Sequence, residues 1–147
     1  MGALIIGCGN IDRGDDAAGL LVARRLRAMG IPAQEFSGDA ASLMERWAGA
    51  DAVILIDAAT CDAPAGAVSV WRANDEPLRP AISSTSTHGF GVAEAIELAR
   101  ALNRLPRSLL VYCIAGANFA MGSAPSPAVL SAVEKTAQDV AASRLIP

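Results

Sequence analysis

Two short runs of apolar residues most constrain how this chain can fold, because each run ends directly at a turn of glycine or acidic residues. Residues 52–56 are Ala-Val-Ile-Leu-Ile and lead into Asp57, and residues 4–6 are Leu-Ile-Ile and lead into the Gly-Cys-Gly-Asn turn of residues 7–10. A short apolar run bounded by turn residues is typical of a strand that is buried on both faces. Such strands occur in parallel sheets whose faces are covered by helices.

Helical patterns alternate with these strands along the chain. Apolar residues recur at helical spacing over residues 15–29, where Gly30 is a natural stop, and again in the segment that begins at His88. We therefore predict one domain over residues 1–147, a three-layer α/β sandwich with a mostly parallel five-stranded sheet, helices on both faces and one antiparallel edge strand. The expected strands are residues 3–8, 32–36, 52–57, 67–71 and 108–114, and the expected helices are residues 15–29, 40–47, the segment from His88, and 127–143.

The composition excludes several classes of function. Although 52% of the 147 residues are hydrophobic, no apolar run approaches the roughly 18 residues of a membrane span, so we expect no membrane insertion. The net charge of −3 argues against nucleic-acid binding, which needs clustered cations. Cys8, Cys61 and Cys113 are odd in number and lie in or beside apolar strands, which indicates reduced thiols. The N-terminus has no signal-peptide pattern, and we expect a cytoplasmic protein.

The acidic turns and the only histidine form a candidate cation site. Ligands collect at the carboxyl ends of the strands in open parallel sheets, so we expect Asp15 or Asp16, Asp57 and His88 to meet there. Two carboxylates and one imidazole suit a metal ion. The glycine turn does not fit a dinucleotide site, because Asp12 stands where the third glycine of that fingerprint is needed. The phosphate-loop pattern is absent as well.

Each of these residues also has a structural explanation. Asp15 and Asp16 would interact favourably with the positive N-terminal end of the first helix, by on the order of 0.5 kcal/mol. Ser126 precedes Pro127 and is expected to be the N-cap of the last helix. Two long loops, residues 73–87 and 115–126, are expected to border the site, because long loops in compact domains are often functional.

Taken in order, these motifs resemble the hydrogenase maturation endopeptidases. The similarity runs through nearly the whole chain. Its elements are Gly7-Cys8-Gly9-Asn10, Asp15-Asp16 with Gly19, the strand-end Asp57, Ser86-Thr87-His88 at a helix start, and the late segments 116–119 and 126–129. Two positions depart from the commonest form of the pattern: Ala17 stands where glycine often follows the acidic pair, and residues 116–118 replace a frequent Ile/Val-x-Pro style loop. Neither departure touches the proposed ligands.

The resemblance implies an α/β endopeptidase that removes the C-terminal peptide from the large-subunit precursor of a nickel–iron hydrogenase once nickel is inserted. By motif position it implies that Asp16, Asp57 and His88 contact the nickel and carry the reaction. We expect the nickel to come with the substrate, and we expect no organic cofactor. An Asp acting as general base, as in an aspartic-type peptidase, and a metal-assisted mechanism both stay open.

Two other interpretations of the residues also stay open. A cysteine peptidase would pair His88 with Cys8 or Cys61, and alkylation of the thiols would then abolish its activity. A metal-site chaperone without enzymatic activity would use the same three ligands as the endopeptidase. It would leave the mass of its partner protein unchanged.

Overall fold

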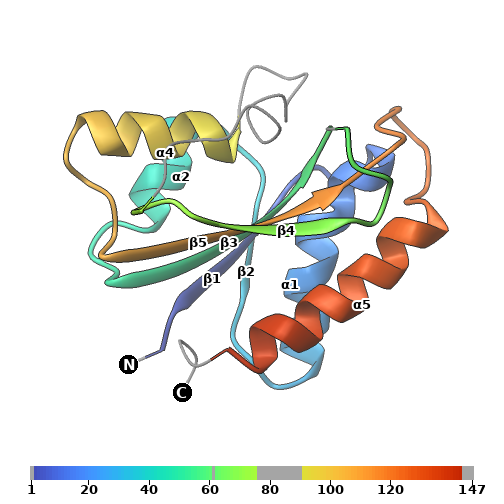
Figure 1. The fold of residues 1–147 in the computed structure, drawn as a ribbon, viewed down its shortest axis with the longest axis horizontal. Helices are drawn as coiled ribbons and strands as arrows, with labels where there is room; N and C mark the ends of the chain where they lie inside the picture. Colours follow the sequence, from blue (N-terminus) through green and yellow to red (C-terminus); the bar gives the residue numbers. More distant parts are fainter. Residues whose placement is uncertain (1, 61, 76–90, 144–147) are drawn as a thin grey trace.

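The computed structural model describes residues 2–60, 62–75 and 91–143, and strands alternate with helices along the chain (Figure 1). The strands are β1 (Leu4–Cys8), β2 (Gln34–Phe36), β3 (Ala52–Ala59), β4 (Val68–Arg72) and β5 (Ser108–Ala115). The helices are α1 (Ala18–Ala28), α2 (Ala40–Arg46), α4 (Val92–Ala101) and α5 (Pro127–Ala141), and a short 3-10 helix, η1 (Gly14–Ala17), precedes α1. Across the described ranges, no helix has the length and apolar character needed to span a membrane.

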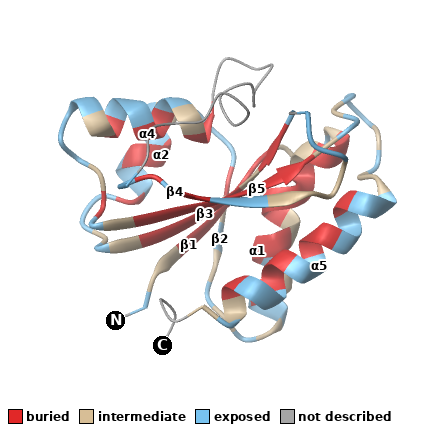
Figure 2. Ribbon diagram, viewed as in Figure 1, coloured by how far each residue is buried: buried red, intermediate tan, exposed pale blue. Residues whose placement is uncertain are grey.

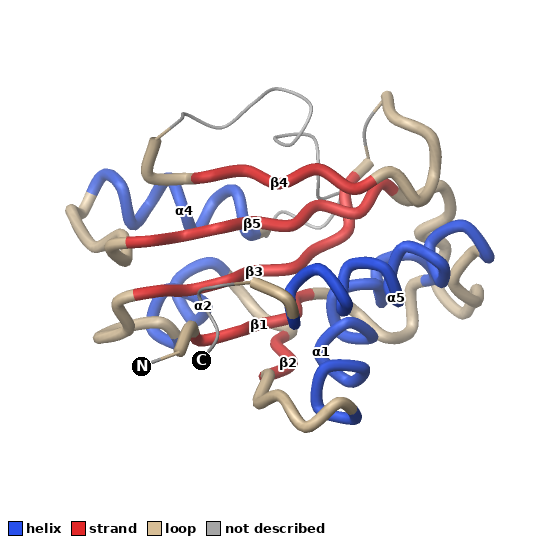
Figure 3. The backbone as a smooth tube through the Cα atoms, turned by 60° about the horizontal axis from the view of Figure 1, so that its bottom comes forward, coloured by secondary structure: helices blue, strands red, loops and turns tan. Residues whose placement is uncertain are grey.

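The five strands form one sheet in the order β2-β1-β3-β5-β4 (Figure 3). β1 pairs in parallel with β2 and with β3, and β3 pairs in parallel with β5. β4 lies at the edge and pairs with β5 in the antiparallel direction. The predicted α/β fold, with a mostly parallel five-stranded sheet and one antiparallel edge strand, is therefore confirmed.

Helices cover both faces of the sheet, α1 and α5 on one and α2 and α4 on the other (Figure 1). Successive side chains of a strand point to opposite faces, so β3 contributes to two cores. Ile54 and Ile56 belong to the core under α1 and α5, whereas Val53 and Leu55 belong to the core under α2 and α4. Both cores exclude water from the central strands, which Figure 2 shows as buried. This double burial explains why the sequence of β3 is continuously apolar.

Helix α1 approaches the sheet closely because Gly19 has no side chain. A Cβ atom on Gly19 would lie 2.3 Å from the carbonyl oxygens of both Cys8 and Ile56, which is far inside van der Waals contact. The helix backbone therefore packs directly on the carboxyl ends of β1 and β3. This contact brings η1, which directly precedes α1, to the same edge of the sheet.

Several boundaries differ from those predicted, and three of them bear on the site. β3 continues beyond Asp57 to Ala59, because its pairing with β5 extends to that residue. The first helix was expected from Asp15, but α1 begins at Ala18 after the 3-10 turn. The helix expected from His88 begins at Val92, with Gly91 as its extended N-cap residue. His88 itself lies outside the described residues.

Candidate functional site

Asp16 and Asp57 both lie at the carboxyl edge of the parallel strands, where ligands bind in this class of fold. Asp16 is in η1, and Asp57 is in β3 near its carboxyl end. The turn between β1 and η1 is held on two sides: the Gly9 N–H donates to the Phe36 carbonyl (3.1 Å), and the Asn10 N–H donates to the Asp16 carbonyl (3.2 Å). The prediction that these two acids come from neighbouring strand ends is consistent with this arrangement.

The Asp57 side chain lies on the face of the sheet covered by α2 and α4. It points to the same face as Leu55 and Ala59, two positions away on either side, and both of these belong to that core. Cys113 is its neighbour on β5, and Cys8 at the end of β1 belongs to the same core. One oxygen of Asp57, Oδ1, accepts a hydrogen bond from the Ala58 N–H at 2.9 Å. The carboxyl group of Asp57 is thus set among apolar and thiol groups that solvate a negative charge poorly.

Burial and the charge of Asp16 both favour the neutral form of Asp57. Burial raises the pKa of Asp57 well above its ordinary value of 3.8, Asp16 raises it further, and the bond from Ala58 opposes them. Burial also raises the pKa of the Cys8 thiol well above its ordinary value, with a further contribution from Asp57, while Arg46 opposes. Asp16 and Asp57 are therefore electrostatically coupled, and Cys8 remains a protonated thiol at neutral pH.

Asp15 has a different environment from the adjacent Asp16. Its side chain is fully buried. Its Oδ2 accepts the N–H groups of Ala117 (2.8 Å) and Asn118 (3.0 Å), and its Oδ1 accepts the Ser126 N–H (2.6 Å) and the Ser126 hydroxyl (3.0 Å). Burial alone would raise the pKa of Asp15, but these hydrogen bonds, led by that of the Ser126 N–H, lower it below the ordinary value. Asp15 is therefore a charged residue within the fold.

Ser126 takes part in this contact instead of capping α5. It occupies the predicted N-cap position before Pro127, yet its hydroxyl makes no capping bond and donates to Asp15. Asp15 and Ser126 are 111 positions apart in the chain. Local patterns therefore indicated neither the partner of Asp15 nor the second role of Ser126.

His88, the third expected site residue, is not among the described residues, so its distance from Asp16 and Asp57 stays a prediction. Within residues 2–60, 62–75 and 91–143, no three His, Cys, Asp or Glu side chains are grouped so that they could hold a metal ion. Asp16 and Asp57 offer two carboxylates. A metal ion bound there would need further ligands, from His88 or from a bound partner.

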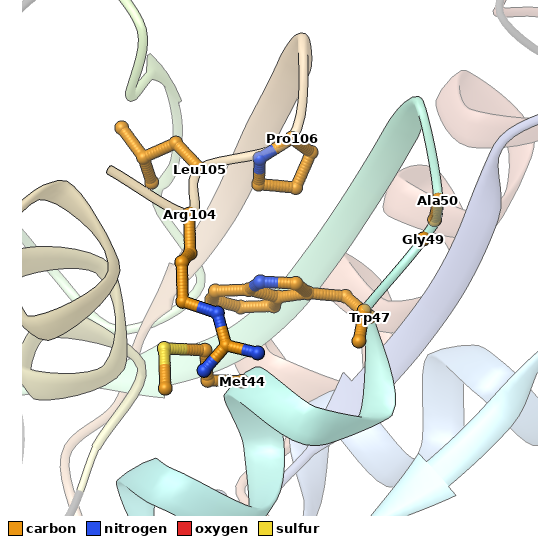
Figure 4. Close-up of a pocket in the computed structure, with 8 residues that line it drawn as sticks. Met44, Trp47, Gly49, Ala50, Arg104, Leu105 and Pro106 are labelled. Atoms are coloured by element: carbon orange, nitrogen blue, oxygen red, sulfur yellow. The ribbon is translucent and has the colours of Figure 1, made fainter. Parts of the chain in front are cut away.

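A cavity of about 250 Å³ lies at the opposite edge of the sheet (Figure 4). It is lined by the turns that precede β3 and β5, including Ala50 and Pro106, and by the side chains of Trp47 and Arg104. The described residues that line it include no carboxylate, thiol or imidazole. Because it lies at the amino ends of the strands, it is separate from the acidic site.

Comparison with known proteins identifies relatives of this chain. Residues 38–143 match the profile of the HycI family, described as hydrogenase maturation protease. Over 85 residues the chain is 31% identical to Protein FrxA of Pyrococcus furiosus. That match covers 58% of this chain and 61% of the length of FrxA.

Solved structures of hydrogenase maturation proteases have the same fold. The [NiFe] hydrogenase maturation protease HybD of Thermococcus kodakarensis is similar with a TM-score of 0.73 and 26% identity, covering 96% of this chain and 97% of that one. The hydrogenase maturating endopeptidase HybD of Escherichia coli is similar with a TM-score of 0.77 and 22% identity, covering 95% and 90% of the two chains. The profile match spans most of the chain, from α2 through α5. This chain belongs to the hydrogenase maturation protease family.

Proposed function

We propose that this protein is an endopeptidase that removes the C-terminal peptide from the large-subunit precursor of a nickel–iron hydrogenase, and that it recognises the nickel already inserted there. The observation that carries the proposal is the coupled pair of Asp16 and Asp57 at the carboxyl edge of the sheet, in a member of the hydrogenase maturation protease family. Peptide hydrolysis needs groups that bind a metal or move a proton, and this pair can do both.

In this proposal the nickel arrives as part of the substrate. Nickel held by cysteine thiolates of the precursor can accept Asp16, Asp57 and His88 as additional ligands, whereas these three alone make a weak site. A cation between Asp16 and Asp57 also relieves the repulsion that contributes to the raised pKa of Asp57. Binding of the nickel therefore favours loss of the Asp57 proton. Cleavage then depends on a correctly loaded precursor.

Asp57 has two possible roles in the hydrolytic step. A carboxylate with raised proton affinity is a stronger base than an ordinary aspartate, which suits it to take a proton from the water that attacks the scissile carbonyl. In the other role Asp57 is a ligand only, and the nickel polarises the scissile carbonyl. Both roles require the Asp57 carboxylate, so both predict loss of activity when it is replaced by an amide.

The environment of Cys8 argues against a cysteine peptidase that uses this residue. A cysteine nucleophile must be accessible and must ionise readily, yet Cys8 is buried and its thiol pKa is raised. Cys61, the other candidate, lies outside the described residues, and thiol alkylation tests it. We place the protein in the cytoplasm, where a free thiol such as Cys8 stays reduced.

The test uses purified hydrogenase large-subunit precursor in nickel-loaded and nickel-free forms, with mass spectrometry to detect loss of the C-terminal peptide. Only the loaded form should be cleaved. Asp16→Asn, Asp57→Asn and His88→Ala should each lower the rate by at least about 100-fold. Asp51→Asn, at an exposed position just before β3, is the matched control and should leave the rate unchanged.

Three results would contradict the proposal. Equal cleavage of the nickel-free precursor would show that the protein does not recognise nickel. An unchanged precursor mass, together with transfer of nickel to or from the precursor, would favour the metal-site chaperone. Wild-type rates in all three site variants would place the active site elsewhere in the protein.

A further inference from the structure

The loop between β5 and α5 is joined to η1 by an extensive set of hydrogen bonds. Besides the four donors to the Asp15 carboxylate, the loop accepts a bond: the Asp15 N–H donates to the Asn118 carbonyl at 2.8 Å. The Gly14 N–H donates to the Ser123 carbonyl at 3.1 Å, and the Gly122 N–H donates to the Asp12 carbonyl at 2.7 Å. In Figure 1 this loop, in orange, lies beside the blue segment that contains η1. The two segments therefore form one bonded unit at the carboxyl edge of the sheet.

The two segments are also in direct backbone contact. Gly14 has a φ of +56°, and a Cβ atom there would lie 2.3 Å from the Asn118 carbonyl oxygen. No side chain fits between η1 and the loop at this point. The hydrogen bonds to the Asp15 carboxylate are therefore made beside a point of close backbone packing.

The position of the Asp16 side chain depends on this interface, because η1 has little stability of its own. η1 contains four residues and has no side-chain bond at its N-cap, and 3-10 turns of this length form a poor hydrogen-bond ladder. The Asp16 N–H donates to the Arg13 carbonyl at 3.0 Å, within the same short turn. The carboxylate of Asp15, the residue next to Asp16, bonds η1 to the loop.

We propose that Asp15 is a positioning residue for the peptidase reaction: its carboxylate fixes η1 against residues 117–126 and thereby holds the Asp16 carboxylate beside Asp57. This inference rests on the proposed function. Asp15 is fully buried, so it acts through Asp16 and does not contact the substrate. Small displacements of a catalytic group are costly, because the reacting groups must be aligned in the bound complex.

Asp15→Asn tests the proposal with almost no change of side-chain shape. Each carboxylate oxygen of Asp15 accepts bonds from two directions. An amide has one oxygen, and its NH2 group would face backbone N–H donors, with the Ser126 hydroxyl as the one group in this contact able to accept from it. About half of the hydrogen bonds to this side chain are lost, whichever way the amide group is turned. We expect the kcat for cleavage of nickel-loaded precursor to fall about 10- to 100-fold, as for other residues that orient a metal ligand.

Ser126→Ala gives a graded second variant. It removes the hydroxyl donor but keeps the charge of Asp15 and the three backbone N–H bonds. We expect a smaller loss of kcat than in Asp15→Asn. Val140→Ala is the matched control for stability, because Val140 is fully buried in the core under α5 and makes no contact with the acidic site among the described interactions. Its loss of methyl groups should destabilise the fold without changing kcat per folded molecule.

The rates are measured at saturating precursor and divided by the folded fraction, which circular dichroism gives at the assay temperature. If Asp15 were merely structural, Asp15→Asn would behave like Val140→Ala. Amide hydrogen exchange at Ala117, Asn118 and Ser126 supplies a readout that needs no peptidase activity. We expect Asp15→Asn to increase exchange at these three amides, and Val140→Ala to leave them protected.

Each outcome decides the question. Unchanged exchange in Asp15→Asn overturns the proposal, because the carboxylate would then not hold the loop. Faster exchange with wild-type kcat per folded molecule also overturns it, because the contact would not position Asp16. If the wild-type protein cleaves no loaded precursor, the proposed function fails and the positioning role with it, while the exchange data still show whether Asp15 binds the loop.

Discussion

Replacing Asp57 by Asn should stabilise the protein at neutral pH and abolish its proposed activity. The amide has nearly the same shape, and its oxygen can still accept the Ala58 N–H that Asp57 accepts at 2.9 Å. The amide carries no charge. Burial and the negative charge of Asp16, which both raise the pKa of Asp57, therefore no longer destabilise the folded state at this position. A tenfold change in proton affinity corresponds to about 1.4 kcal/mol.

The stabilisation should depend on pH in one direction. Because Asp57 binds its proton more tightly in the folded state, its favourable contribution is complete below the ordinary pKa of 3.8, where the carboxyl is protonated in both states. As the pH rises above that value, the Asp57 carboxyl ionises first in the unfolded chain. The contribution to stability then falls steadily, and it stops falling once the carboxyl has also ionised in the folded protein. Wild type and Asp57→Asn should therefore be similarly stable at pH 3.5. At pH 7 the variant should be more stable, by about 1.4 kcal/mol or roughly 3–6 °C in Tm for each tenfold difference in the proton affinity of Asp57 between the folded and unfolded states.

Thermal unfolding followed by circular dichroism between pH 3.5 and 8, with a chelator present, measures this difference. Asp51→Asn makes the same chemical change at an exposed position just before β3 and should leave Tm unchanged. A Tm of Asp57→Asn at or below that of wild type at pH 7 would refute the reasoning. A gain that persists undiminished at pH 3.5 would refute it equally, because packing and not charge would then be the cause.

Three further predictions concern packing, thiol reactivity and metal content. Gly19→Ala should lower the free energy of unfolding by about 3 kcal/mol or more in urea titrations, because the added methyl would meet two carbonyl oxygens at 2.3 Å; a loss below about 1 kcal/mol would show that α1 can move away from the sheet. Cys8 should react with iodoacetamide much more slowly than a free cysteine, since its thiol is buried with a raised pKa; peptide mapping that finds rapid labelling would contradict this. Elemental analysis should find less than one metal ion per purified chain; one tightly held zinc whose removal stops cleavage of loaded precursor would identify a resident zinc enzyme.

The alternation of strands and helices was predictable because its signal is local. The continuous apolar sequence of β3 reflects burial on both faces, and the helical spacing in α1, α4 and α5 reflects burial on one side. The element boundaries were less predictable, because they depend on pairing between distant segments. β3 extends past Asp57 only because β5 provides partners as far as Ala59.

The candidate site could be predicted in part from topology. Asp16 follows β1 and Asp57 lies near the carboxyl end of β3, and these two strands are neighbours in the sheet. The order of the strands therefore places the two acids at the same edge. The roles of Asp15 and Ser126 could not be predicted in this way. Their contact joins positions 15 and 126, and each residue alone matched a common local pattern, a helix-start acid and an N-cap serine. The placement of His88 remains a prediction.

The two adjacent acids of η1 show how environment decides what an aspartate does. Asp15 is buried among four hydrogen-bond donors, which lower its pKa and make the charged form part of the folded structure. Burial raises the pKa of Asp57, and the negative charge of Asp16 raises it further. The same substitution should therefore have opposite effects at the two sites: Asp15→Asn should destabilise the protein at pH 7, and Asp57→Asn should stabilise it. A raised pKa of this kind is expected at a functional site, and the cation binding proposed above would relieve the repulsion between Asp16 and Asp57.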